Sequence, residues 1–119
     1  PKGGPGMREM YKAMKYLYGQ GLAKSTAVIT DGRFSGTNNG CFVGHISPEA
    51  AEGGTIALVE DGDSVEIDVD AGILTLHVDN AELERRRQAW KAPDLYIPKG
   101  YLRSYARLAS SADQGAVLH

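Results

Sequence analysis

The chain has 119 residues, enough for one compact domain with a modest core, and 42% of them are hydrophobic while 24% are charged. A formal net charge of −2 with no Lys/Arg block gives no basic surface for nucleic acid, and no apolar run approaches the ~20 residues that span a membrane. Cys41 is the single cysteine, which excludes an internal disulfide and fits a reducing, cytoplasmic environment.

Helices and strands are expected to alternate after a Gly/Pro-rich opening. Apolar residues at helical spacing predict helices over residues 7–18, 81–90 and 100–108. Apolar or alternating runs predict strands over residues 25–30, 41–43, 55–59, 64–69 and 73–78. Residues 91–99 are expected to form a linker or a strand along the surface, and residues 110–119 a poorly anchored tail. The order of elements predicts a mixed α/β fold.

Three boundary features carry local predictions. Ser47 is a candidate N-cap for a short helix that begins at Pro48, and Asn80 is a candidate N-cap for the helix over 81–90. The arginines at 85–87 follow acidic residues at the helix start, which favours a solvated, ion-paired face over a phosphate site. Glu9 falls in the first turn of the expected first helix, where an acid interacts favourably with the helix dipole.

The stretch from Thr30 to Gly40 is the candidate functional loop. It follows the apolar run 27–29 and contains glycines, asparagines, an acid, a base and a serine, with Phe34 as its apolar residue. A polar, glycine-rich loop at the end of a buried strand places reactive groups on a rigid support. We therefore expect ligand contacts here.

Several named chemistries do not fit this loop. Position 33 is Arg, so no Gly-x-Ser-x-Gly elbow surrounds Ser35, and the glycines form neither a phosphate-binding loop nor a dinucleotide fingerprint. His45, His77 and Cys41 lack zinc-site spacing. Each histidine is expected to be structural or on the surface, and Cys41 is expected to be a small buried side chain. Residue types alone predict a polar ligand-binding loop and leave its reaction open.

Three longer motifs in the sequence resemble those of a known protein family. Pro-Lys-Gly-Gly-Pro-Gly-Met-Arg-Glu-Met at 1–10, Thr-Asp-Gly-Arg-Phe-Ser-Gly at 30–36 and Gly-His-Ile-Ser-Pro-Glu-Ala-Ala at 44–51 occur in order. They resemble the C-terminal part of the dihydroxy-acid and phosphogluconate dehydratase family, and the ending at 100–112 favours the dihydroxy-acid branch. The resemblance covers essentially the whole chain. It implies a β-barrel-like swivelling domain flanked by helices, similar to that of the aconitase group.

The resemblance also implies a chemistry. The family removes water from a 2,3-dihydroxy acid to give a 2-keto acid, in the dihydroxy-acid branch during synthesis of valine, leucine and isoleucine. Ser35 matches the serine that takes the C2 proton, and Glu9 matches a Mg²⁺ ligand, an alternative to the dipole interpretation. An iron–sulfur cluster acts as Lewis acid, with its cysteines on an N-terminal domain. The residues expected to contact substrate are Arg33, Gly36, Thr37 and Asn38.

The resemblance leaves the exact substrate open. The family reads Gly-Gly-Thr after the serine, whereas here Gly36, Thr37 and Asn38 follow it. A sugar-acid dehydratase and a non-catalytic binding module of the same fold are therefore kept as alternatives. Because the chain begins at Pro1 and holds one cysteine, we expect residues 1–119 to be a single C-terminal domain of a longer enzyme, inactive by itself, whose full-length form is a homodimer.

Overall fold

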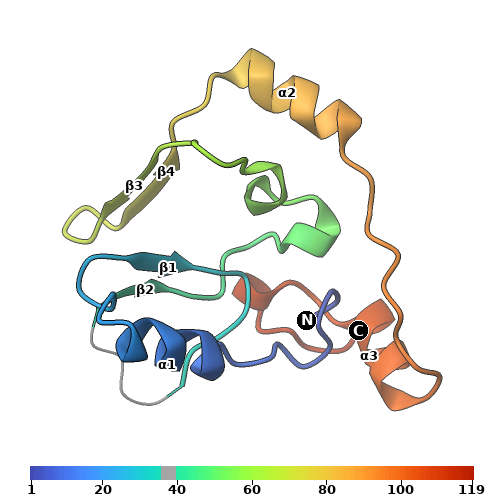
Figure 1. Cartoon of the computed structure of the whole chain (residues 1–119). Helices are drawn as coiled ribbons and strands as arrows, with labels where there is room; N and C mark the ends of the chain where they lie inside the picture. Colours follow the sequence, from blue (N-terminus) through green and yellow to red (C-terminus); the bar gives the residue numbers. More distant parts are fainter. Residues whose placement is uncertain (36–39) are drawn as a thin grey trace.

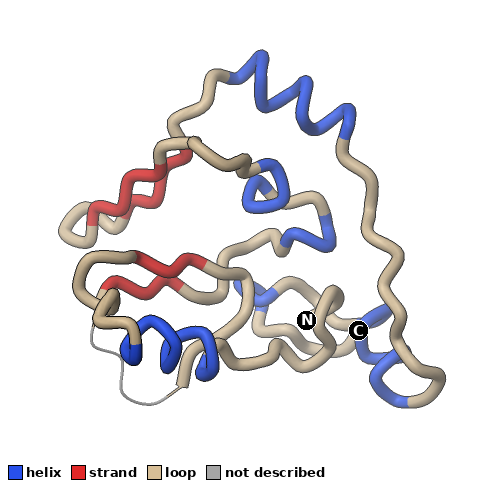
Figure 2. The backbone as a smooth tube through the Cα atoms, in the orientation of Figure 1, coloured by secondary structure: helices blue, strands red, loops and turns tan. Residues whose placement is uncertain are grey.

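A computed structural model describes residues 1–35 and 40–119 and confirms the mixed α/β class (Figures 1 and 2). The α-helices are α1 (Tyr11–Gly19), α2 (Asn80–Ala89) and α3 (Tyr101–Leu108). The strands are β1 (Ala27–Ile29), β2 (Cys41–Val43), β3 (Val65–Asp68) and β4 (Ile73–Leu76), and the 3-10 helices are η1 (Ala50–Glu52), η2 (Thr55–Leu58) and η3 (Ala112–Gln114). Among the described residues, no helix is both long enough and apolar enough to cross a membrane.

Strands β1 and β2 form a parallel pair that carries the candidate loop between them. Their register pairs Ala27 with Cys41 and Ile29 with Val43. Helix α1 lies along this pair (Figure 1), where Tyr18 meets Phe42 edge-on with ring centroids 6.5 Å apart. Met14, only 2% exposed, is the buried side chain of α1. The pair and the helix together support the described residues at the two ends of the loop, 30–35 and 40.

Strands β3 and β4 form an antiparallel hairpin that leads into α2. The hairpin pairs Val65 with Leu76, and the turn that joins its strands begins as expected near Asp70. Helix α2 begins after Asp79, whose carboxylate accepts a hydrogen bond from Glu82 N at 2.9 Å. The N-cap is therefore Asp79, and the prediction of Asn80 was wrong by one residue.

An extended segment over residues 91–99 connects α2 to α3, so of the two predicted alternatives the linker is confirmed and the surface strand is wrong (Figure 1). The tail, in contrast, is anchored. Ala109 and Leu118 form an antiparallel bridge, and Ser110 N donates to Val117 O at 2.8 Å. The expectation of a poorly anchored tail was wrong because these backbone contacts close it into a loop after α3.

Two further local predictions are corrected. Thr55–Leu58 is the 3-10 helix η2 and not a strand, and it buries Leu58 at 3% exposure. Ser47 does not cap a helix, since its hydroxyl donates to His45 O at 3.0 Å and η1 begins after Glu49. The barrel-like swivelling architecture stays a prediction, because the described residues form two separate two-stranded sheets.

An apolar groove of about 480 Å³ separates the two sheets. Its lining residues come from both sheets and from the segment between them: Ile29, Val43, Gly44, Ile46, Ser47, Thr55, Ile56, Val59, Val65, Leu74 and Leu76. Parallel strands in proteins are normally covered on both faces. The groove therefore presents apolar surface that a further part of a protein can cover.

Candidate active site

The candidate loop leaves β1 and runs beside the segment that precedes α1. Glu9 and Arg33 form an isolated parallel bridge. Met10 N donates to Arg33 O at 2.8 Å, and Arg33 N donates to Arg8 O at 3.4 Å. These backbone hydrogen bonds hold residues 8–10 beside residue 33. The side chains at positions 9 and 35 therefore lie next to each other.

Ser35 and Glu9 are in direct contact. The Ser35 hydroxyl donates a hydrogen bond to Glu9 Oε2 at 2.6 Å, between residues 26 positions apart in the sequence, and both residues are exposed. Helix α1 begins only at Tyr11 and has no acid in its first turn. The interpretation of Glu9 as a helix-dipole partner was therefore wrong, and its carboxylate belongs to the loop site.

The remaining predicted ligand contacts divide into two groups. Arg33 is exposed, and its Nε donates to Met7 O at 2.5 Å, so the guanidinium helps to hold the segment that carries Glu9. Gly36, Thr37 and Asn38 lie outside the described residues, and their expected substrate contacts stay predictions.

Asp31 fixes the beginning of the loop to a third segment. Its Oδ2 accepts a hydrogen bond from Ala50 N at 2.7 Å, at the start of η1. Next to it, a Cβ at Gly32 would lie 3.1 Å from Arg8 O, a distance that few side chains tolerate. The absence of a side chain at this position therefore permits the close approach of the two backbones.

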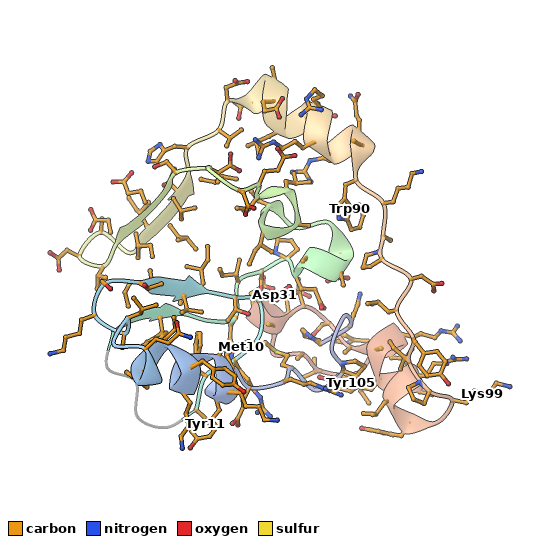
Figure 3. The ribbon with its side chains drawn as sticks, in the orientation of Figure 1. Met10, Tyr11, Asp31, Trp90, Lys99 and Tyr105 are labelled. Carbon is orange, nitrogen blue, oxygen red and sulfur yellow. The ribbon has the colours of Figure 1, made fainter. Side chains whose placement is uncertain are left out.

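A cleft of about 380 Å³ opens where the three segments meet. Its lining includes Met7, Arg8, Met10, Asp31, Gly32 and Glu49, and Figure 3 shows Met10 and Asp31 in this central region. Sequence reasoning missed Asp31 and Glu49 as site-building residues. Both stand inside the long motifs, but their partners are backbone amides of segments far away in the chain, which no local pattern reveals.

Among residues 1–35 and 40–119, Glu9 offers one ligand position that fits a hard cation. Glu9 offers an exposed carboxylate, and Mg²⁺ usually takes one or two protein carboxylates together with water and substrate oxygens. Within residues 1–35 and 40–119, no group of three or more His, Cys, Asp or Glu side chains could hold a metal ion.

The same residues do not fit an iron–sulfur cluster. Such a cluster needs several thiolates, and Cys41 is the single cysteine of the chain. Cys41 was expected to be a small buried side chain, which is wrong: it is exposed. The reason is its place at the first residue of β2, paired with Ala27, which is also exposed.

Comparison with known proteins identifies the family of the chain. The family model described as dihydroxy-acid/6-phosphogluconate dehydratase C-terminal matches residues 1–116. The dihydroxy-acid dehydratase of Ruminiclostridium cellulolyticum is 55% identical over 118 residues, which are 99% of this chain and 21% of that protein. Its counterpart in Chromohalobacter salexigens is 56% identical over 117 residues, 98% of this chain and 20% of that protein. The chain thus spans about a fifth of the length of the relatives it matches.

Proposed function

Since the chain belongs to the dihydroxy-acid/6-phosphogluconate dehydratase C-terminal family, we propose that it supplies the proton-abstracting part of a hydro-lyase that converts 2,3-dihydroxy acids to 2-keto acids. The observation that carries the proposal is the 2.6 Å hydrogen bond between Ser35 and Glu9. The family resemblance assigns these two residues to the base and to the metal, and the fold brings them into contact.

Ser35 is the base in this proposal. Its oxygen takes the C2 proton, the electrons of the C2–H bond form the double bond of an enol, and the C3–O bond breaks as the 3-hydroxyl takes up a proton from solvent and leaves as water. Tautomerisation of the enol then gives the 2-keto acid. Ser35 must first lose its own proton, and the hydrogen bond directs that proton toward the Glu9 carboxylate, from which it can pass to solvent because both residues are exposed.

Glu9 has a second part in the proposal, as the carboxylate of this chain that holds Mg²⁺. When bound, Mg²⁺ supplies the positive potential that a serine alkoxide needs and a Lewis acid for substrate oxygens. Arg33 adds positive charge beside the serine while its Nε holds Met7 O. No step is assigned to an iron–sulfur cluster, since this chain lacks the ligands for one.

The substrate class proposed first is a branched 2,3-dihydroxy acid, on the route to valine, leucine and isoleucine. The relatives reported above carry the name dihydroxy-acid dehydratase, which favours this branch over sugar acids. The sugar-acid alternative keeps one support: Thr37 and Asn38 depart from the usual motif at the substrate-facing loop.

The proposed partner is the remaining part of a longer polypeptide, which carries the cluster and the other metal ligands. The difference in length between this chain and its relatives supports it, and so does the open apolar groove between the sheets. We propose further that residues 1–119 are inactive alone and that the full-length enzyme is a cytoplasmic homodimer.

The test compares two substrates in the full-length enzyme. A branched 2,3-dihydroxy acid and an aldonate are assayed separately for 2-keto acid formation. The proposal predicts a clearly higher kcat/KM for the branched acid. The opposite preference would move the protein to the sugar-acid branch, and a fully loaded enzyme that turns over neither acid would leave a binding module as the better explanation.

A further inference from the structure

Glu49 is the one charged or polar residue that is buried among the described residues, with an exposure of 6%. Its Oε1 accepts a hydrogen bond from Lys2 N at 2.8 Å, and its Oε2 accepts one from Gly3 N at 2.8 Å. A buried carboxylate is costly unless its oxygens are hydrogen-bonded. Glu49 meets that condition by binding the backbone of a segment that is distant in sequence.

The approach of the two backbones at this point is unusually close. A Cβ added at Gly3 would lie 2.7 Å from Ala51 Cβ and 3.2 Å from Glu49 Oε2. A side chain at position 3 would therefore push the amide away from the carboxylate. Glycine and glutamate together build an anchor for residues 2 and 3.

The anchored segment leads directly to Glu9. Met7 N donates to Gly4 O at 2.8 Å and closes a turn, and Met10 N then donates to Arg33 O at 2.8 Å. Glu9 lies between this turn and this last bond. Its backbone is thus held at one end by the Glu49 anchor and at the other by the loop that carries Ser35.

The residue after Glu49 is tied to the other half of the site. Ala50 N donates to Asp31 Oδ2 at 2.7 Å, and Asp31 stands at the start of the serine loop. The neighbours Glu49 and Ala50 therefore connect to both catalytic segments, one through a side chain and one through a backbone amide. A shift at Glu49 moves the segment of Glu9 relative to Ser35.

We propose that Glu49 is a positioning residue, which acts through Glu9 by holding residues 2–10 in the place where the Glu9 carboxylate can bind Mg²⁺ beside Ser35. The proposal rests on the proposed function, in which Glu9 is the metal ligand. In this proposal Glu49 acts through the backbone of residues 2 and 3, whose amides its two carboxylate oxygens hold.

Calorimetric titration of the full-length enzyme with Mg²⁺ tests the proposal. In Glu49→Gln the amide nitrogen replaces one acceptor oxygen, so one part-buried N–H of residue 2 or 3 loses its partner and the segment shifts. We expect the Kd for Mg²⁺ to rise about tenfold, as for outer-sphere groups that orient a ligand. Gly3→Ala breaks the same anchor while it keeps the carboxylate, and it should raise the Kd in the same direction if Glu49→Gln does not fold.

The matched control is Glu52→Gln. Glu52 also contacts residue 2, but through an exposed ion pair with the Lys2 side chain and without a backbone amide. Such a pair contributes little to fixing the backbone. The Kd for Mg²⁺ should therefore stay within about twofold of the unaltered enzyme.

A double-mutant cycle separates positioning from general stabilisation. In a Glu9→Gln background the Glu49→Gln change should no longer weaken Mg²⁺ binding, because the group on which it acts is gone. An equal loss in both backgrounds would overturn the proposal, and so would Kd values for Glu49→Gln and Gly3→Ala within twofold of the unaltered enzyme. If Glu9→Gln alone leaves the Kd unchanged, the proposed function fails at Glu9, which is a different outcome.

Discussion

Two regions of the molecule are held together by different kinds of bond. The segments of the site region (residues 2–10, 31–35 and 45–51) are joined by the carboxylates of Glu49 and Asp31, which accept hydrogen bonds from backbone amides. The scaffold region (residues 58–90) is joined by one guanidinium. Arg86, only 10% exposed, binds Asp63 at 2.5 Å, Glu82 at 2.8 Å and the Leu58 carbonyl at 2.9 Å.

The difference assigns separate tasks to the two regions. In the site region each bond fixes backbone, so a change there alters the place of Glu9 or Ser35. In the scaffold region the Arg86 side chain joins the Leu58 carbonyl of η2, the Asp63 side chain before β3 and the Glu82 side chain of α2, and these elements carry none of the proposed catalytic groups. We therefore expect changes in the scaffold to alter stability with little effect on catalysis, and changes in the site region to do the reverse.

The largest effect on stability is expected for Arg86→Leu in the full-length enzyme. Removal of the guanidinium leaves the half-buried Asp63 and Glu82 carboxylates close together without their shared cation. A thermal melt should show a clear fall in Tm, while the kcat of the protein that remains folded stays unchanged. Arg85→Leu is the control, because Arg85 is largely exposed and forms its ion pair with Glu82. Equal falls in Tm for both variants would contradict the central place of Arg86.

The next effect concerns the groove that both regions line. Val65 lines it, whereas Val69 lies one residue beyond β3 and is 80% exposed. If the rest of a full-length chain covers the groove, Val65→Asp buries a carboxylate in apolar surroundings and lowers the free energy of unfolding by about 2 kcal/mol. Val69→Asp should change it by less than about 0.5 kcal/mol. Denaturant unfolding of both variants measures these changes. A Val65→Asp variant with an unchanged free energy of unfolding would show that the groove stays open to water.

A smaller effect is expected in acid. The hydrogen bonds from Arg85 and then Arg86 lower the pKa of Glu82 from 4.5 to about 2, and the Arg86 bond lowers the pKa of Asp63 as well. Because these values are lower in the folded than in the unfolded chain, the stabilisation is complete above the unfolded pKa and is lost as the pH falls through the folded pKa.

The free energy of unfolding should therefore decrease between about pH 4.5 and pH 2, with a shallower decrease in Arg86→Leu. Urea unfolding at stepwise pH values measures this slope. If Arg86→Leu and the unaltered enzyme have the same slope, the ion pairs do not contribute to acid sensitivity.

Local patterns in the sequence predicted those elements that depend only on neighbouring residues. The strand at 41–43, the hairpin around Asp70 and the helix ending at Leu108 need only apolar periodicity and turn residues, and the structure contains them. The candidate loop was likewise visible from its glycines and polar side chains. The motif resemblance then selected Ser35 and Glu9, which the structure places in contact.

Features that depend on distant partners escaped prediction. Arg86 stands in a run of three arginines that was expected to be a solvated face, and only the fold turns its side chain toward Asp63. Glu49 looked like a helix-entry residue, and its partners at positions 2 and 3 lie 47 and 46 residues away. Thr55–Leu58 has the composition of a strand but curls into η2 and buries Leu58. In each case a tertiary contact decides over local propensity.

The most direct test of the account follows the C2 proton. A substrate with deuterium at C2 is given to the full-length enzyme, and release of the label to solvent is measured for the unaltered enzyme, Ser35→Ala and Ser25→Ala. Ser25 is an exposed serine whose hydroxyl bonds Leu22 O, and it is the matched control. We expect Ser35→Ala to slow label release at least about 100-fold while Ser25→Ala leaves it unchanged. Release from Ser35→Ala at the unaltered rate would contradict the assignment of Ser35 as the base.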